Sequence, residues 1–103
     1  MGVCLLISQN YRKETVYISE AALLHIAEEH PEISLFQMEA ALRYPSEVRK
    51  SSYREDSELH YLPLDKHYYI CVVVKQCEDG WYVATALTVT QPKTGRLIFR
   101  RGA

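Results

Sequence analysis

The sequence contains little of what usually identifies a protein's function or location. Its 103 residues include three cysteines, Cys4, Cys71 and Cys77, an odd number without the paired spacing of a metal site. This favours reduced thiols and a cytoplasmic location. Apolar runs such as residues 70–74 are too short to cross a bilayer. Residues 1–7 are apolar but have no basic leader and no obvious cleavage site, so we expect neither a signal peptide nor membrane association.

Sequence motifs of several enzyme classes are also absent. The chain has no glycine-rich phosphate loop, no HExxH, no CxxC and no GxSxG. Its three aspartates, Asp56, Asp65 and Asp79, all fall in turn-like contexts. Because a two-metal nuclease needs several clustered acids, that class is excluded, and we expect neither a metal ion nor a cofactor.

The composition is that of an ordinary globular domain, and we interpret residues 1–103 as a single domain. Hydrophobic residues make up 48% and charged residues 24% of the chain. The net charge is −1, but it is unevenly distributed, since residues 1–42 carry two basic and six acidic side chains while residues 43–103 carry ten basic and seven acidic ones. The second half of the chain is therefore the candidate for binding an anionic partner.

Two helices are predicted in the acidic first half. Ser19 is a good N-cap for the Ala-, Leu- and Glu-rich residues 20–29, and Pro31 prevents that helix from continuing. Ser34 begins a capping-box pattern that predicts a second helix, which ends before Pro45.

After Pro45 the apolar period changes from 3.6 to 2, which indicates strands. We expect them at residues 47–54, 59–64, 66–76, 81–90 and 96–100, with a hairpin at Asp79-Gly80. Helices followed by strands predict an α+β fold with two N-terminal helices packed on a four- to five-stranded antiparallel sheet. The predicted core consists of Leu23, Ile26, Leu35, Met38, Leu42, Ile70, Val72, Val74, Val83 and Leu87.

The apolar residues 3–7 have no clear place in that core. As an isolated strand they would expose unpaired backbone groups, so they either pair with residues 15–18 or contact a second copy of the chain. The hairpin needs only a short polar loop and is the favoured alternative. We expect a monomer or a weak homodimer, with any dimer contact formed by the first seven residues.

The four histidines are candidates for acid/base chemistry, because imidazole titrates near neutral pH. His25 and His30 point about 140° apart on a helix, which does not suit two ligands of one metal. His30 shares the apolar side of the helix and could equally be a packed helix-end residue. His60 and His67 flank one connection, and we interpret them as a solvated hairpin end rather than as a catalytic pair.

A basic sheet face with interleaved tyrosines could hold an RNA strand through phosphate contacts and stacking. The residues that we expect to contact RNA are Arg49, Lys50, Tyr61, Lys93 and Arg96. An ordinary sheet surface with the usual content of Arg, Lys and Tyr is the alternative.

Several short motifs resemble a known group of proteins. Residues 25–32, HIAEEHPE, are similar to a helix end found in small phage- and toxin-associated nuclease-like domains. Residues 44–48, 69–75 and 82–86 also resemble the pattern of these domains, which belong to the barnase–EndoU–colicin–RelE-like superfamily. The resemblance covers about residues 15–100 and implies helices followed by an antiparallel sheet.

The resemblance implies metal-independent RNA cleavage through attack of the 2′-hydroxyl group. The helix histidines of the family match His25 and His30, which would serve as acid and base, and its strand threonine matches Thr85 as a phosphate donor. Arg54 is the candidate for the stabilising cation, with Lys75 as an alternative. The implied partners are an RNA substrate and an antitoxin or immunity protein.

One departure from the family pattern favours a different function. Glu28 and Glu29 stand where family members often have a basic residue, and their charges would repel a phosphate. The alternative is a non-catalytic module on the same fold that binds RNA or a protein through the sheet.

Overall fold

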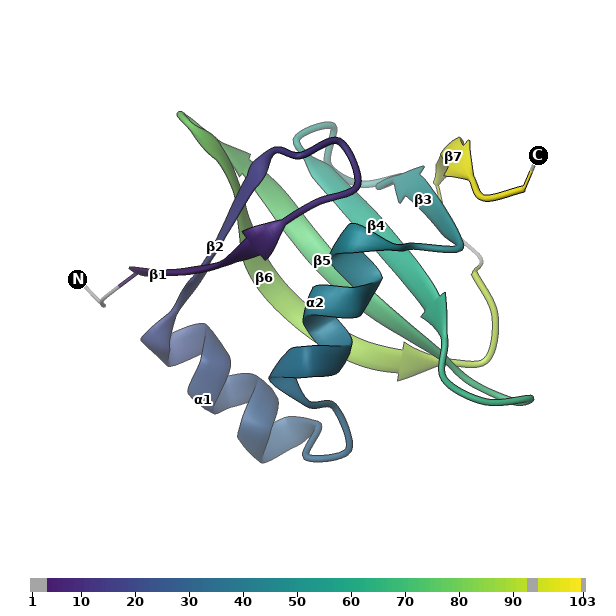
Figure 1. Ribbon diagram of the computed structural model, residues 1–103, viewed down its shortest axis with the longest axis horizontal. Coiled ribbons are helices and arrows are strands. Elements are labelled where there is room, and N and C mark those ends of the chain that lie inside the picture. The colour runs from purple at the N-terminus through teal and green to yellow at the C-terminus, as the bar shows by residue number, and fades with distance from the viewer. Residues whose placement is uncertain (1–3, 93–94, 103) are drawn as a thin grey trace.

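The computed structural model describes residues 4–92 and 95–102 (Figure 1). In chain order the elements are β1 (Cys4–Gln9), β2 (Thr15–Ser19), α1 (Glu20–Glu29), α2 (Leu35–Arg43), β3 (Glu47–Lys50), β4 (Ser57–Pro63), β5 (Tyr69–Cys77), β6 (Gly80–Val89) and β7 (Arg96–Arg100). Within these residues the strands form one seven-stranded mixed sheet in the order β1-β2-β6-β5-β4-β3-β7. The prediction of two helices on a four- to five-stranded antiparallel sheet is therefore wrong.

The sheet is larger than predicted partly because the N-terminal hairpin joins it. β1 and β2 pair in antiparallel fashion, with Leu5 opposite Ile18, so the hairpin itself is confirmed. β2 then lies parallel to β6, with Val16 opposite Trp81. The alternating burial of β2 indicates that one of its faces is covered, and α1 packs against both β2 and β6.

β7 extends the sheet at its other end. It returns to β3 in antiparallel orientation, with Glu47 opposite Arg100 and Lys50 opposite Arg96. β3 itself ends at Lys50, because residues 51–56 form the connection to β4 rather than the predicted continuation of the strand.

The two helices begin where their caps predict. The Ser19 hydroxyl accepts a hydrogen bond from the Ala22 backbone N–H at 3.0 Å. At the second helix the Ser34 hydroxyl accepts from the Gln37 N–H, and the Gln37 side chain accepts from the Ser34 N–H, which completes the capping box. These local contacts satisfy backbone donors that have no partner inside the helix.

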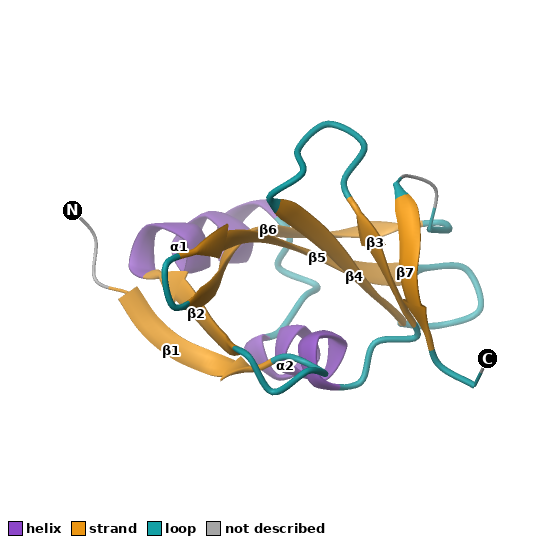
Figure 2. Cartoon of the chain, turned by 90° about the horizontal axis from the view of Figure 1, so that it is seen from above, coloured by secondary structure: helices purple, strands orange, loops and turns teal. Residues whose placement is uncertain are grey.

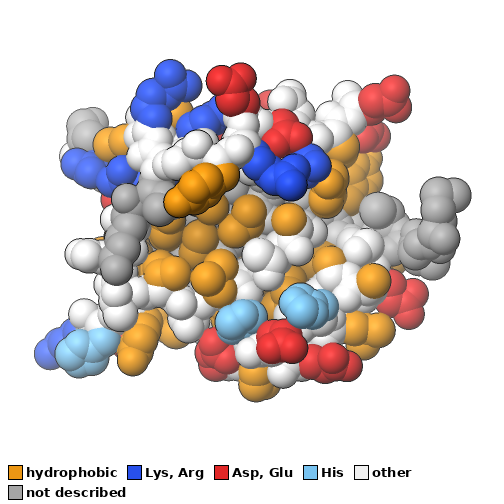
Figure 3. All heavy atoms as spheres, turned by 180° about the vertical axis from the view of Figure 1, so that it is seen from behind, with side chains coloured by type: hydrophobic (Ala, Val, Ile, Leu, Met, Phe, Trp, Pro, Cys, Tyr) orange, Lys and Arg blue, Asp and Glu red, His pale blue; other side chains and the backbone are white. Residues whose placement is uncertain are grey.

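The sheet curves around α2, as Figure 2 shows. α2 packs against β1, β4 and β5, whereas α1 packs against β2 and β6. We call the sheet face turned away from α2 the open face; it carries Leu59, Tyr61, Cys71, Val73, Thr85 and Leu87. Figure 3 shows apolar side chains over the centre of this side of the molecule and a mixture of Lys, Arg, Asp and Glu side chains along its upper margin. No helix in the described part of the chain has the length and apolar character needed to span a membrane.

The core between α2 and the sheet contains most of the predicted residues. Ile26, Met38, Leu42, Ile70, Val72, Val74 and Val83 are buried as predicted. Leu23 and Leu87 are only partly buried, and Leu35 is 46% exposed. Leu35 is the first residue of α2, and its side chain leans past the start of the helix into solvent. Its assignment to the core is wrong.

Leu87 leaves the core because of a β-bulge. The pairing of β5 with β6 shifts between Val73 and Val74, so that Ala84 has no partner on β5. An extra residue reverses the alternation of faces along the strand. Val83 therefore faces α2, while Leu87, opposite Cys71, lies on the open face.

Candidate anion-binding site

The pairing of β3 with β7 gathers cationic side chains at one edge of the sheet. We call this group the basic corner: Arg49 and Lys50 on β3, Arg54 in the β3–β4 connection, and Arg96 and Arg100 on β7. Gly95 makes the close approach possible, because an added Cβ would lie 1.6 Å from the Lys50 carbonyl oxygen and its φ is +85°. The Gly95 carbonyl also accepts a hydrogen bond from Arg49 Nη1 at 3.2 Å.

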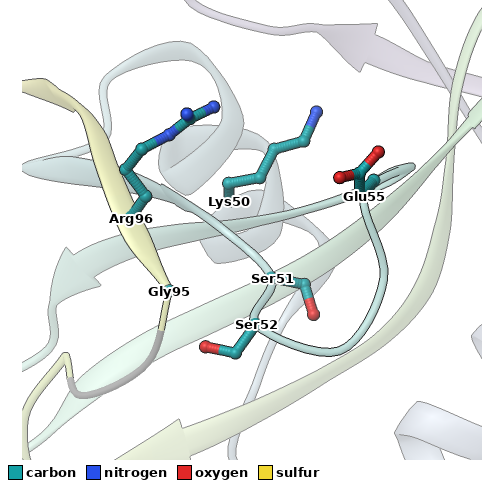
Figure 4. A pocket seen from close by; sticks show the side chains of 6 residues that line it. All are labelled: Lys50, Ser51, Ser52, Glu55, Gly95 and Arg96. Carbon is teal, nitrogen blue, oxygen red and sulfur yellow. The ribbon is translucent and has the colours of Figure 1, made fainter.

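A pocket of about 570 Å³ opens within the basic corner (Figure 4). It is lined by Lys50, Ser51, Ser52, Glu55, Gly95 and Arg96. Figure 4 shows Lys50 between Arg96 and Glu55, with the two serine hydroxyls on the loop beside them. The pocket therefore offers two cations and two hydroxyl donors to a ligand, together with one carboxylate.

The two cations of this pocket lie on neighbouring strands and form no ion pair with a described carboxylate. Lys50 and Arg96 are directly opposite in the β3–β7 pair, an arrangement that is destabilising for like charges. Among the described residues neither side chain has a carboxylate within ion-pair distance. An anion bound between them would relieve the repulsion.

Two further arginines share a carboxylate on the other side of β3. Arg49 Nε lies 2.5 Å from Glu47 Oε2, and Arg100 Nη2 lies 3.9 Å from Glu47 Oε1. Glu47 is opposite Tyr61 in the β3–β4 pair and so faces the open side of the sheet. Sequence reasoning missed Glu47 and did not select Arg100. The basic run at residues 96–101 was a signal for Arg100, but the pairing of its strand with β3 was not predicted.

The RNA-contact residues predicted from the sequence are only partly brought together. Arg49, Lys50 and Arg96 are neighbours in the basic corner. Tyr61 is only 3% exposed, which leaves no ring face for a base, and Lys93 lies outside the described residues. Tyr53, beside Arg54, is 90% exposed and is the aromatic ring that this corner presents to solvent.

The residues predicted to be catalytic lie apart from one another. His25 is exposed on α1, and His30 Nδ1 lies 3.6 Å from Glu32 Oε2. The Glu32 carboxylate in turn accepts a hydrogen bond from the Thr88 hydroxyl at 3.3 Å. The end of α1 is therefore placed beside the C-terminal part of β6, and His30 lies at that end of the sheet.

Arg54 lies at the opposite end. Thr88 is in register with Ile70 and, through it, with Leu62 on β4. Arg54 lies in the connection before β4, which begins at Ser57. Because a strand rises by about 3.3 Å per residue, Arg54 is more than about 16 Å along the sheet from Leu62, and therefore from Thr88. Thr85 lies between these two ends on the open face, opposite Val73. The structure does not bring His25, His30, Thr85 and Arg54 into one cleft.

The interpretation of His60 as a solvated hairpin residue is wrong. His60 is fully buried, because it faces α2 between Val48 on β3 and Val72 on β5. The Tyr11 ring covers it from the β1–β2 loop, with ring centroids 5.8 Å apart. Neither imidazole nitrogen forms a hydrogen bond within the part of the chain that the structure describes.

An ion pair whose carboxylate is buried lies beside this imidazole. Glu58 is 4% exposed; its Oε1 accepts a hydrogen bond from Arg12 Nη2 at 2.7 Å and lies 3.3 Å from His60 Nε2. Burial lowers the pKa of His60 by more than the Glu58 carboxylate raises it. Burial alone would raise the pKa of Glu58, but the interactions with His60 and Arg12 outweigh burial and lower it. Because Glu58 and His60 are buried, they are not placed to meet a substrate. The contact of Glu58 with Arg12 instead connects the β1–β2 loop to β4.

Metal chemistry has no obvious centre in the described residues, since no three His, Cys, Asp or Glu side chains there converge on a point that could hold an ion. The charges and the pocket of the basic corner are the features that suit a ligand best. Comparison of the chain with protein-family models, with curated proteins and with solved structures gives no match.

Proposed function

We propose that the chain is an RNA-binding module whose basic corner holds the phosphate backbone of a single strand. The observation that carries the proposal is the cross-strand pair of Lys50 and Arg96, which lacks a carboxylate partner among the described residues and lines a pocket with two hydroxyl groups. A phosphate group between these cations would accept hydrogen bonds from both and from Ser51 or Ser52.

Two neighbouring side chains support RNA as the ligand rather than a free anion. Tyr53 is almost fully exposed and follows the pocket-lining Ser52 in the same loop, and an exposed ring near cations can stack on an unpaired base. Glu55 lines the same pocket, and its carboxylate can accept a hydrogen bond from a ribose 2′-hydroxyl, which DNA lacks. We therefore expect single-stranded RNA to bind more tightly than DNA of the same sequence.

The proposal is tested by fluorescence anisotropy with a labelled RNA oligonucleotide at several salt concentrations. Binding should weaken as the salt concentration rises. A variant that loses one phosphate contact should show a slope of log K against log salt that is smaller in magnitude by about 0.7. The variant Lys50→Glu should bind markedly more weakly. The matched control Lys66→Glu makes the same charge change in the exposed turn between β4 and β5 and should bind nearly as well as the unmodified chain. Equal losses in both variants would contradict a site at the basic corner.

A second function, metal-independent RNA cleavage, is favoured by one observation on the open face. Glu47 lies between the guanidinium groups of Arg49 and Arg100. A carboxylate in this position can take the proton of a 2′-hydroxyl while the arginines hold the phosphate. The 2′-oxygen would bond to phosphorus, the bond to the 5′-oxygen would break, and that oxygen would take a proton from water. The products would end in a 2′,3′-cyclic phosphate.

This second function is tested by incubating RNA with the protein in EDTA and analysing the product ends. Loss of cleavage in Glu47→Gln with retention in His30→Ala would support the open-face carboxylate. The reverse result would support the histidine mechanism that the family resemblance implies. Absence of cleavage at high protein concentration would leave RNA binding without chemistry. For a cleaving enzyme we propose an antitoxin or immunity protein that covers the basic corner.

We propose a cytoplasmic location for either function. Cys71 and Cys77 are free thiols. Burial raises the pKa of Cys71 to about 12, so it remains protonated and unreactive at physiological pH. These properties suit a reducing compartment.

A further inference from the structure

A second pocket, at the β2–β6 side of the sheet, has the opposite chemistry from the basic corner. It has a volume of about 340 Å³, and its lining residues are Tyr17, Cys77, Asp79 and Tyr82. Most of the surface that they present to the pocket is apolar. Strands β5, β4 and β3 separate β6 from β7, so this pocket and the basic corner lie on different parts of the sheet. Its described lining contains two aromatic rings and a carboxylate but no cationic side chain.

The walls of this pocket are fixed by strand register. Tyr17 and Tyr82 are direct neighbours in the parallel β2–β6 pair, so their side chains leave the sheet on the same face. The Tyr17 hydroxyl donates a hydrogen bond to Asp79 Oδ2 at 2.9 Å, which ties the hairpin turn to β2.

The turn that carries Asp79 is also held closely against β2. Gly80 has a φ of +154°, and an added Cβ would lie 2.3 Å from the Thr15 carbonyl oxygen. Only glycine permits that approach. The close packing of the turn against β2 therefore holds Asp79 next to the tyrosine rings, and the pocket is present without a ligand.

The charges around the pocket are predominantly negative. Glu78 and Asp79 occupy the turn, and both also line an adjoining pocket to which Lys13 and Glu14 contribute. Lys75, which is opposite Tyr82 on β5, has its ammonium group 3.8 Å from Asp56 and is directed to that carboxylate. The surroundings of the two rings consequently favour a cationic ligand over an anionic one.

We propose that this pocket binds an organic cation that carries a methylated ammonium group, of the choline or trimethyllysine type. The faces of tyrosine rings attract cations, most strongly those that give up little hydration, and Asp79 supplies the counter-charge. The methyl groups fit an apolar lining, whereas a bare metal ion would need several oxygen ligands that the described lining does not offer. This site does not depend on the proposed RNA binding, because it shares no residue with the basic corner.

The first experiment compares choline with 3,3-dimethyl-1-butanol, which has the same shape without the charge. In an NMR titration of the intact chain, choline should shift the amide signals of Tyr17, Cys77, Asp79 and Tyr82. The neutral alcohol should bind at least about tenfold more weakly if the rings recognise charge. Equal binding of the two molecules, or no shift with choline at tens of millimolar, would overturn the proposal.

Variants locate the binding at this pocket. Tyr82→Leu should abolish the choline shifts, while Tyr82→Phe should retain most of the binding because it keeps the ring. The matched control Tyr44→Leu changes a tyrosine that is 63% exposed at the end of α2 and should bind as well as the unmodified chain. Circular dichroism and thermal melting establish that each variant is folded. Unchanged binding in a folded Tyr82→Leu would overturn the proposal.

A final comparison separates the two natural sources of the cation. A short peptide with trimethyllysine, the same peptide with unmodified lysine, and choline are titrated in parallel. Tighter binding of the trimethylated peptide assigns the site to a protein side chain, and tighter binding of choline assigns it to a free small molecule. A preference for unmodified lysine over both would overturn the assignment to a methylated cation.

Discussion

The Tyr11 ring lies against the Phe99 ring, with centroids 4.5 Å apart and ring planes tilted by 33°. Tyr11 comes from the loop between β1 and β2, and Phe99 comes from β7. The contact therefore joins β7, at one edge of the sheet, to the loop of the hairpin that forms the other edge. It also covers the buried His60.

We expect this aromatic contact to contribute measurably to stability. Tyr11→Ala and Phe99→Ala should each lower the free energy of unfolding by about 1–3 kcal/mol. The double variant should lose less than the two single losses together, by about 0.5–1.5 kcal/mol, because the rings interact directly. Urea unfolding gives all three values. Strictly additive losses would show that the two edges are not coupled through these rings.

The ion pair between Arg12 and the buried Glu58 predicts a second non-additive result. Arg12→Leu should cost about 3 kcal/mol, because it leaves the Glu58 carboxylate buried without its cation. The double variant with Glu58→Leu should recover most of that loss, since it removes both charges. Lys75→Met, which breaks a more exposed pair with Asp56, should change stability by less than about 1 kcal/mol. A double variant as unstable as Arg12→Leu would contradict this account.

The burial of His60 predicts a loss of stability in mild acid. Its pKa is lowered in the folded chain, so below about pH 6.5 the unfolded chain binds a proton that the folded chain does not. The contribution of His60 to the free energy of unfolding is therefore complete above that pH and decreases as the pH falls. The decrease caused by this one group is at most about 1.4 kcal/mol per pH unit. The lowered pKa of Glu58 adds a further loss at the lower pH where carboxylates protonate.

Urea unfolding between pH 7.5 and pH 5 measures this dependence. His60→Leu should remove most of the slope of the free energy of unfolding against pH, whatever its effect on stability at neutral pH. His67→Gln, which replaces an exposed histidine, should leave the slope unchanged. A slope that survives His60→Leu would assign the acid sensitivity to another group.

The outer edge of β1 remains the predicted contact of any dimer. β1 is the first strand in the sheet order and, within the described part of the chain, pairs only with β2; Leu5 on it is 44% exposed. Light scattering should give the mass of a monomer or of a weak dimer, and Leu5→Lys should abolish the dimer by placing a charge on that edge. A dimer that persists in Leu5→Lys would indicate a different interface. Point substitution is preferable to deletion, since removing β1 would also uncover β2.

Sequence reasoning succeeded where the determining interactions are local. Ser19 and Ser34 bond to backbone groups within three residues, so the starts of both helices can be found without knowledge of the rest of the chain. The face of β6 could not be predicted beyond Ala84, because a β-bulge depends on how the partner strand is aligned. The position of Leu87 was therefore wrong although its strand was right.

The candidate site shows the same division. Arg49, Lys50 and Arg96 could be selected as cations, but their juxtaposition depends on β7 returning to β3, which no local pattern specifies. The burial of His60 likewise results from the Tyr11 ring, which reaches it from a distant loop. Residue type was enough to identify candidate site residues. Which of them lie close together is decided by the long-range pairing of strands and loops.

The parallel pairing of β2 with β6 also has a consequence for how the protein is made. Val16 pairs with Trp81, which lies in the last quarter of the chain. During synthesis the hairpin and both helices leave the ribosome well before β6 exists, so the apolar side of β2 and the buried side of α1 stay uncovered for that time. A nascent chain that stalls before Gly80 cannot complete its core and presents that surface to chaperones.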